Sequence, residues 1–169
     1  MRATIDTDEK QRALAFAEKT GLLCEQLGLP RMAGRVVGWL LVCDPAHTSL
    51  VELAEVLQAS KGSISTSTRL LEQFKVIERV TFPGDRRDYV RMISGAWEKM
   101  MNRFEQESRM MRDLAAEGLA LLADAQPDRR GRLQEMHAIY EFLLEMSPLL
   151  ESEWRKRQAE KRAGGNSNS

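Results

Sequence analysis

The spacing of apolar residues in this chain shifts from a helical period to alternation over one short segment and then back, which limits the folds open to it. Apolar residues recur at helical spacing up to Phe74 and again from residue 94 onward. Between them, residues 77–82 and 87–92 alternate apolar and polar side chains, with the turn formers of residues 83–85 in the middle. The sequence therefore predicts a mainly α-helical protein with one small β-hairpin.

Capping residues mark the helices that precede the hairpin. A first helix is expected to begin at a capping box headed by Asp6 and to run to about Gly28, and a largely buried second helix follows. Ser49 with Glu52 three residues later forms another capping box, and Ser60 caps the next helix. Two short helices joined by a tight turn are typical of a helix-turn-helix motif.

The helical pattern after the hairpin is long and strongly apolar. Trp97, Phe104, Met111 and Gly118 occupy one heptad column, so this helix is expected to need a partner. A last helix is predicted after residue 127, with a kink at Pro148. The predicted organisation is a helical dimerisation region (6–29 and 95–157), a DNA-binding domain (30–94) and a flexible tail (158–169).

Several classes of protein are excluded or disfavoured by what the sequence lacks. It carries no phosphate loop, zinc-binding motif or nucleophile elbow, so neither an enzyme nor a cofactor is predicted. It shows no signal peptide and no apolar run long enough to cross a membrane, which favours a cytoplasmic protein. Cys24 and Cys43 lie in apolar surroundings without CxxC spacing and are interpreted as reduced core thiols. A redox switch at these two cysteines is the alternative.

The positive charge is concentrated around the helix-turn-helix and the hairpin. The whole chain has 25 Lys and Arg against 25 Asp and Glu, but residues 60–91 hold seven positive and four negative side chains. With Ile64, Leu71 and Phe74 facing the core, the opposite helix face is small and polar, as a helix in the major groove requires. That face and the hairpin tip carry the residues predicted from the pattern to meet DNA: Ser60, Gly62, Ser65, Thr66, Arg69, Arg86 and Arg87. This order of elements is that of a winged helix-turn-helix.

Three motifs resemble one family of regulators. The segments GLPRMAGR (28–35), SKGSIS (60–65) and PGDRRDY (83–89) look like the GbsR branch of the MarR transcriptional regulators, closest to actinobacterial repressors of membrane transporter genes. The resemblance implies a homodimeric winged-helix repressor (MarR-like) whose first, fifth and sixth helices build the dimer. It also implies a pseudo-palindromic operator in double-stranded DNA and release by a small apolar or amphipathic effector.

The resemblance also assigns residues. It places Ser60, Lys61, Gly62, Ser63 and Ser65 at the start of the recognition helix (60–75), and Arg86 and Arg87 in the wing (78–92). It gives Arg35 a structural role, and Lys75 departs from the family by replacing a glycine that ends the recognition helix. The ligand cleft that it implies would be lined by Met32, Val36, Phe104 and Met111.

Two other functions stay open on the sequence alone. In a helical adaptor, the long helices would be the working surface and the winged helix would bind protein. In a redox-switched regulator, oxidation of Cys24 or Cys43 would replace the ligand. The small polar face of the recognition helix favours DNA over protein, because protein-binding helices tend to present aromatic or aliphatic anchors.

Overall fold

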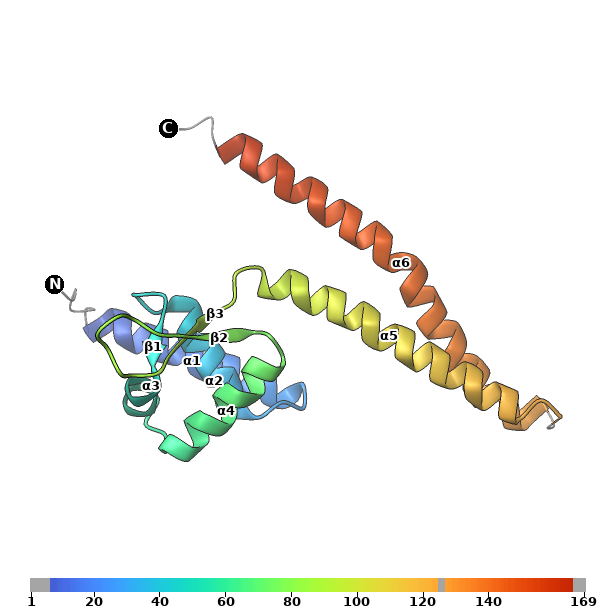
Figure 1. The fold of residues 1–169 in the computed structure, drawn as a ribbon, viewed down its shortest axis with the longest axis horizontal. Coiled ribbons are helices and arrows are strands. Elements are labelled where there is room, and N and C mark those ends of the chain that lie inside the picture. Colours follow the sequence, from blue (N-terminus) through green and yellow to red (C-terminus); the bar gives the residue numbers. More distant parts are fainter. Residues whose placement is uncertain (1–6, 125–126, 166–169) are drawn as a thin grey trace. The chain divides into compact units, whose positions relative to one another are not determined.

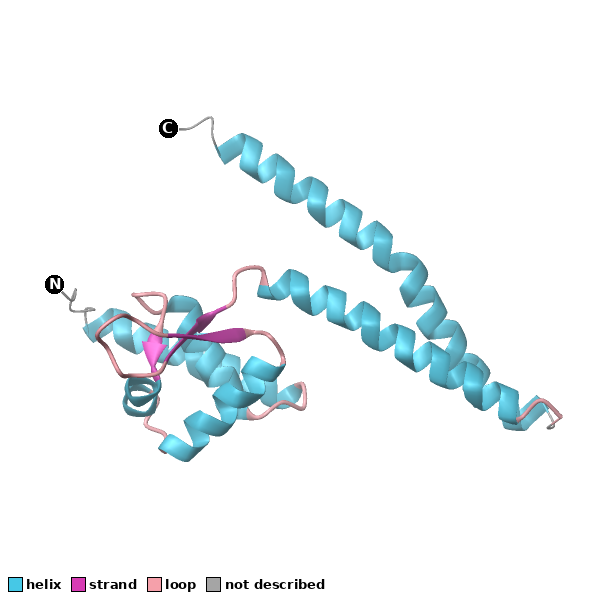
Figure 2. Cartoon of the chain, in the orientation of Figure 1, coloured by secondary structure: helices cyan, strands magenta, loops and turns pink. Residues whose placement is uncertain are grey.

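The structure is a computed structural model that describes residues 7–124 and 127–165 (Figure 1). As predicted, it is mainly helical with one small antiparallel sheet (Figure 2). The chain divides into two compact units, Met1–Met100 and Met101–Ser169. The elements in chain order are α1 (Thr7–Gln26), α2 (Arg31–Val42), β1 (Thr48–Ser49), α3 (Leu50–Val56), α4 (Lys61–Gln73), β2 (Ile77–Val80), β3 (Tyr89–Met92), α5 (Ala96–Leu121) and α6 (Pro127–Gly165).

The predicted caps of α3 and α4 are confirmed. The Ser49 Oγ accepts a hydrogen bond from the Glu52 amide, and the Glu52 carboxylate accepts one from the Ser49 amide. At α4, the Ser60 Oγ accepts from the Ser63 amide at 3.1 Å. These bonds satisfy amides that have no partner within the helix and so fix where each helix begins. The cap predicted for α1 at Asp6 lies outside the described residues.

Helices α1 and α2 pack closely because small residues line the seam between them. A Cβ added at Gly38 would lie 2.7 Å from the Ala17 Cα, and one added at Gly34 would lie 2.8 Å from the Gly21 Cα. No larger side chain fits at these two positions without the helices moving apart. The seam therefore fixes α1 on α2.

A single apolar core holds the first unit together. Its fully or nearly fully buried side chains come from α1, α2, α3, α4 and the sheet: Ala17, Ala33, Val36, Val37, Trp39, Leu40, Leu53, Leu57, Ile64, Leu71, Ile77 and Val90. The buried Trp39 Nε1 donates to the Thr48 Oγ1 at 3.1 Å, so the indole N–H is satisfied inside the core.

The hairpin is confirmed, with shorter strands than predicted and one additional strand. β2 and β3 pair over four residues each, with Ile77 opposite Met92 and Val80 opposite Tyr89. β1 adds two residues to the other edge of β3, which gives the order β1-β3-β2. The added pairing joins the segment before α3 to the wing, so the wing and the helix-turn-helix share one sheet.

The end of α4 corrects two expectations. Lys75 was expected to change how this helix ends, but it adopts φ of 56°, the left-handed conformation that a glycine would supply. The Lys75 amide donates to the Glu72 carbonyl and the Val76 amide to the Leu71 carbonyl, both at 3.0 Å. Phe74 was expected in the core and is instead exposed, because it caps the helix beyond its buried face.

The second unit consists of most of α5 together with α6. Leu133 of α6 lies against Gly118 of α5, where a Cβ would come within 2.8 Å of its Cδ1. Helix α6 continues past residue 157, where a flexible tail was predicted, to Gly165, and residues 166–169 lie outside the described part. It also runs through Pro148, where the kink stays a prediction. Of the helices described, none has the length and apolar character needed to cross a bilayer.

Candidate DNA-binding surface

The N-terminal turn of α4 is the centre of the candidate site. The turn from α3 passes through Gln58, which has φ of 50°, and Ser60 then caps α4. Beyond Gly62 there is open space, because a Cβ added there would meet only the Ser60 Oγ, at 4.0 Å. Packing within the described chain therefore does not require this glycine, and its small size leaves the helix terminus accessible to a large anion such as a DNA backbone.

The polar face predicted for α4 is largely confirmed. Ile64 and Leu71 are buried, whereas Thr66, Arg69 and Gln73 are exposed and Ser65 is half-buried. Ser67 and Thr68, which are also polar, lie on the buried side, where the Thr68 Oγ1 donates to the Ser65 carbonyl at 3.2 Å. The face left to solvent is thus narrow and made of short side chains around Arg69.

Four cations of residues 60–91 are without polar partners among the residues that the structure describes: Lys61, Arg69, Lys75 and Arg86. The other three are neutralised within the protein. Arg79 pairs with Glu72 at 2.7 Å and Arg91 with Glu78 at 2.8 Å. The excess positive charge predicted for this segment therefore resides on side chains that are available to a ligand.

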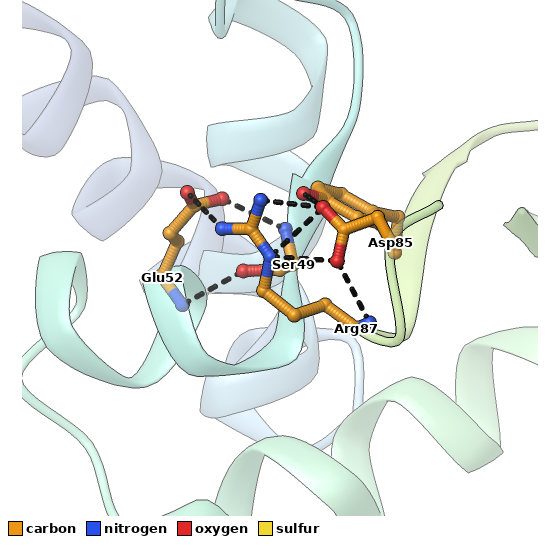
Figure 3. Close-up of polar contacts among 5 residues, drawn as sticks. Ser49, Glu52, Asp85 and Arg87 are labelled. Carbon is orange, nitrogen blue, oxygen red and sulfur yellow. Dashed lines mark hydrogen bonds and ion pairs between the residues drawn. The ribbon is translucent and has the colours of Figure 1, made fainter. Parts of the chain in front are cut away.

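Arg87, which was predicted to meet DNA from the wing, is the third paired cation, and its contact with DNA stays a prediction. Its Nη2 lies 2.6 Å from the Asp85 Oδ2, and its Nη1 lies 3.4 Å from the Glu52 Oε1 (Figure 3). The guanidinium also lies over the Tyr89 ring, 5.1 Å from its centroid. Arg86, next to it in the chain, is the exposed cation of the wing tip.

The Asp85 carboxylate organises the loop of the wing. It accepts from the backbone and side chain of Arg87 and, at 2.8 Å, from the Tyr89 hydroxyl. The hydrogen bonds from Arg87 hold the pKa of Asp85 well below its usual range, so this carboxylate stays charged. Because Glu52 is also part of the α3 capping box, its contact with Arg87 connects the wing to the start of the helix-turn-helix (Figure 3).

An aromatic cluster lies at the base of the wing. The His47 ring packs against Phe82 with centroids 4.6 Å apart, and Phe82 meets Tyr89 edge-on at 5.0 Å. His47 is half-buried in this cluster. Its three members precede β1, follow β2 and lie in β3, so the pairing of these strands brings them together and no local pattern predicts the cluster.

The residues predicted to line a ligand pocket fall in both units. In the first unit, Met32 is half-buried and Val36 is fully buried in the core. On α5, Phe104 is 51% exposed and Met111 is 37% exposed. The pocket stays a prediction.

The two cysteines are free thiols, each half-buried. Burial raises the pKa of Cys24, and burial likewise raises the pKa of Cys43. A raised pKa disfavours the thiolate, which is the form that reacts with oxidants. No group of three or more metal-binding side chains occurs in the described ranges 7–124 and 127–165.

Comparison with known proteins shows which proteins this chain is similar to. Residues 95–157 match the profile of the MmpR5-like MarR family transcriptional regulators. The HTH-type transcriptional regulator MmpR5 of Mycobacterium tuberculosis is 43% identical over 130 residues, which are 77% of this chain and 79% of that protein. The protein in a crystal structure of a transcriptional regulator is 39% identical to this chain and superposes with a TM-score of 0.76. The matched region is 86% of this chain and 99% of the chain in that structure.

Proposed function

The chain belongs to the MarR family of transcriptional regulators, and we propose that it binds operator DNA as a homodimer through α4 and the wing. Transcriptional regulators of this family are not enzymes, and the protein is expected to act on DNA in the cytoplasm. The finer assignment to the GbsR branch stays a prediction.

One observation carries the DNA-binding proposal. Lys61, Arg69 and Arg86 have no polar partner within residues 7–124 and 127–165, while the remaining cations of the wing are paired with carboxylates. Free cations beside a short-chained helix face are what phosphate and base-edge contacts need. Ser60, Gly62, Ser63, Ser65 and Thr66 would let α4 approach the major groove closely, and Arg86 would reach a phosphate or the adjacent minor groove.

Homodimerisation is supported by apolar side chains that the single chain leaves exposed. On α1 they include Leu22 and Leu23, which are 43% and 56% exposed. On α5 and α6 they include Trp97, Phe104, Met110, Leu114, Leu121, Phe142, Leu149 and Leu150. A monomeric soluble protein rarely exposes so many large apolar side chains on so few elements. A two-fold dimer would present its two α4 helices to major grooves about 34 Å apart, which calls for a pseudo-palindromic operator.

Regulation would come from a small apolar or amphipathic effector. It would favour a dimer in which the distance between the two recognition helices does not match the distance between successive major grooves. Of the predicted lining residues, Phe104 and Met111 both lie on α5, where an aromatic and an unbranched side chain that remain exposed suit adaptable apolar contacts. The effector would shift the population only by its difference in affinity between the two spacings. In this proposal DNA binding represses transcription and the effector relieves repression.

The test is fluorescence anisotropy with the duplex immediately upstream of the protein's own gene, compared with a random duplex over a salt series. Operator affinity about a hundredfold or more above random affinity supports the proposal. Equal, weak binding to both duplexes contradicts it for that operator and directs the search to other promoters. Sedimentation over a dilution series of the same protein tests the dimer.

A further inference from the structure

The carboxylate of Glu18, on α1, receives both arginines of the GLPRMAGR segment. Arg31 donates to the Glu18 Oε1 through its Nε at 2.9 Å and also through its Nη2. The Arg35 Nε lies 2.9 Å from the other oxygen, Oε2. The hydrogen bonds from Arg31 lower the pKa of Glu18, so its charge persists at neutral pH.

Arg35 carries this contact onward to the helix-turn-helix. Its Nη2 donates to the Leu57 carbonyl at 2.9 Å, 22 residues along the chain. Leu57 is the C-terminal cap of α3, where helix carbonyls lack partners within the helix and attract a cation. Ser60, the cap of α4, follows only three residues later. Arg35 therefore holds the turn from which α4 begins.

Close packing holds the stem of Arg35 against α1, the helix that carries Glu18. A Cβ at Gly21, one turn further along α1, would lie 2.6 Å from the Arg35 Cγ, so the arginine stem lies directly on the α1 backbone. The Arg35 side chain is only 23% exposed, and without Glu18 its charge would lose the carboxylate that it pairs with. A partly buried cation without a counter-charge tends to turn to solvent, which would release the Leu57 carbonyl.

We propose that Glu18 is a positioning residue for DNA binding, which holds Arg35 on the Leu57 carbonyl and thereby sets the turn between α3 and α4. Glu18 itself does not meet DNA. This inference rests on the proposed function, in which α4 enters the major groove. Because α1 also carries apolar side chains assigned to the dimer, such as Leu23, the Glu18–Arg35–Leu57 contact would relay the position of a dimer helix to the recognition helix.

The experiment compares wild type with Glu18→Ala in the full-length protein, using two readouts. The first is affinity for operator and random duplexes by anisotropy. The second is hydrogen exchange of the backbone amides of residues 57–60, measured without DNA. Single changes in coupled networks of this kind have modest effects, so we expect about five- to tenfold weaker operator binding and less than about a twofold change on random DNA. We also expect faster exchange at residues 57–60.

Two further variants make the test specific. Asp8→Asn removes a carboxylate from the same helix, and its ion pair with Arg12 is far more exposed and does not lead to α3, so both readouts should stay unchanged. Glu18→Asp keeps the negative charge that pairs with Arg35 and should recover part of the protection at residues 57–60.

Each outcome decides for or against the proposal. Unchanged exchange at residues 57–60 overturns it, whatever happens to DNA affinity, because the turn would then not depend on Glu18. Equal losses on operator and random DNA also overturn it, because they indicate a general loss of charge or fold. If wild type fails to prefer the operator, the proposed function fails for that site, and the exchange measurement still decides whether Glu18 holds the turn.

Discussion

The sharpest prediction separates the two adjacent arginines of the wing. Arg86 is exposed and unpaired within the described residues, whereas Arg87 is tied to Asp85 and Glu52. Replacing Arg86 by Gln should remove one phosphate contact per protomer and two per dimer. Each contact contributes about −0.9 to the slope of log affinity against log salt, so the slope should become shallower by about 1.8. When salt is raised from about 50 to about 200 mM, the variant should then lose affinity by a factor that is about 12 times smaller than the factor for wild type.

The assay is an anisotropy titration of the operator at four or more salt concentrations, with thermal unfolding measured in parallel. Arg86→Gln should leave the unfolding temperature unchanged, because no internal contact is lost. Arg91→Gln is the matched control, since it removes one positive charge from the same hairpin but one that is already paired with Glu78. An Arg86→Gln slope equal to that of wild type, or an equal change in Arg91→Gln, would contradict a phosphate contact by Arg86.

Three further predictions concern the scaffold of the site. Lys75→Gly should raise the free energy of unfolding in urea by about 1 kcal/mol by relieving the left-handed backbone, whereas Lys75→Ala, which keeps that backbone strained, should not. Gly38→Ala should lower the free energy of unfolding by about 1–3 kcal/mol, because the new Cβ meets the backbone of α1. Gly131→Ala should leave the free energy of unfolding unchanged, because the position has open space around it. Folding lowers the pKa of Glu18, so the ionised carboxylate stabilises the folded protein. This contribution is fully present above the pKa of the unfolded chain, about 4.3, and is lost as the pH falls through the lower pKa of the folded protein. Glu18→Gln should therefore flatten the loss of stability below about pH 4, and an unchanged urea midpoint profile between about pH 3 and 6 would contradict this.

Local chemistry was sufficient to predict most elements of the DNA-binding half. The capping boxes at Ser49 and Ser60 involve residues only three apart, so their hydrogen bonds can be inferred from the sequence. The change from period 3.6 to period two likewise placed the hairpin, because alternation reports which strand face is buried. The polar face of α4 followed from the same periodicity.

Contacts between residues far apart in the chain could not be predicted from the local sequence pattern. β1 has only two residues, too few to show alternation, and it exists because its backbone pairs with β3 some forty residues later. The partner of Arg87 that lies outside the wing, Glu52, is 35 residues away, so the sequence offered no reason to distinguish Arg87 from Arg86. Such pairings depend on how the turn after α3 and the sheet bring the wing over the helix-turn-helix.

By itself, then, the sequence determined where helices and strands begin, which face of α4 is polar and where positive charge gathers, because those properties depend on neighbours within one or two turns. Which cations lack a polar partner among the described residues depends on the tertiary fold, since charge pairing depends on distances in space. The left-handed backbone of Lys75 at the end of α4 is also a tertiary feature, because Leu71 before it and Ile77 after it are both buried in the core.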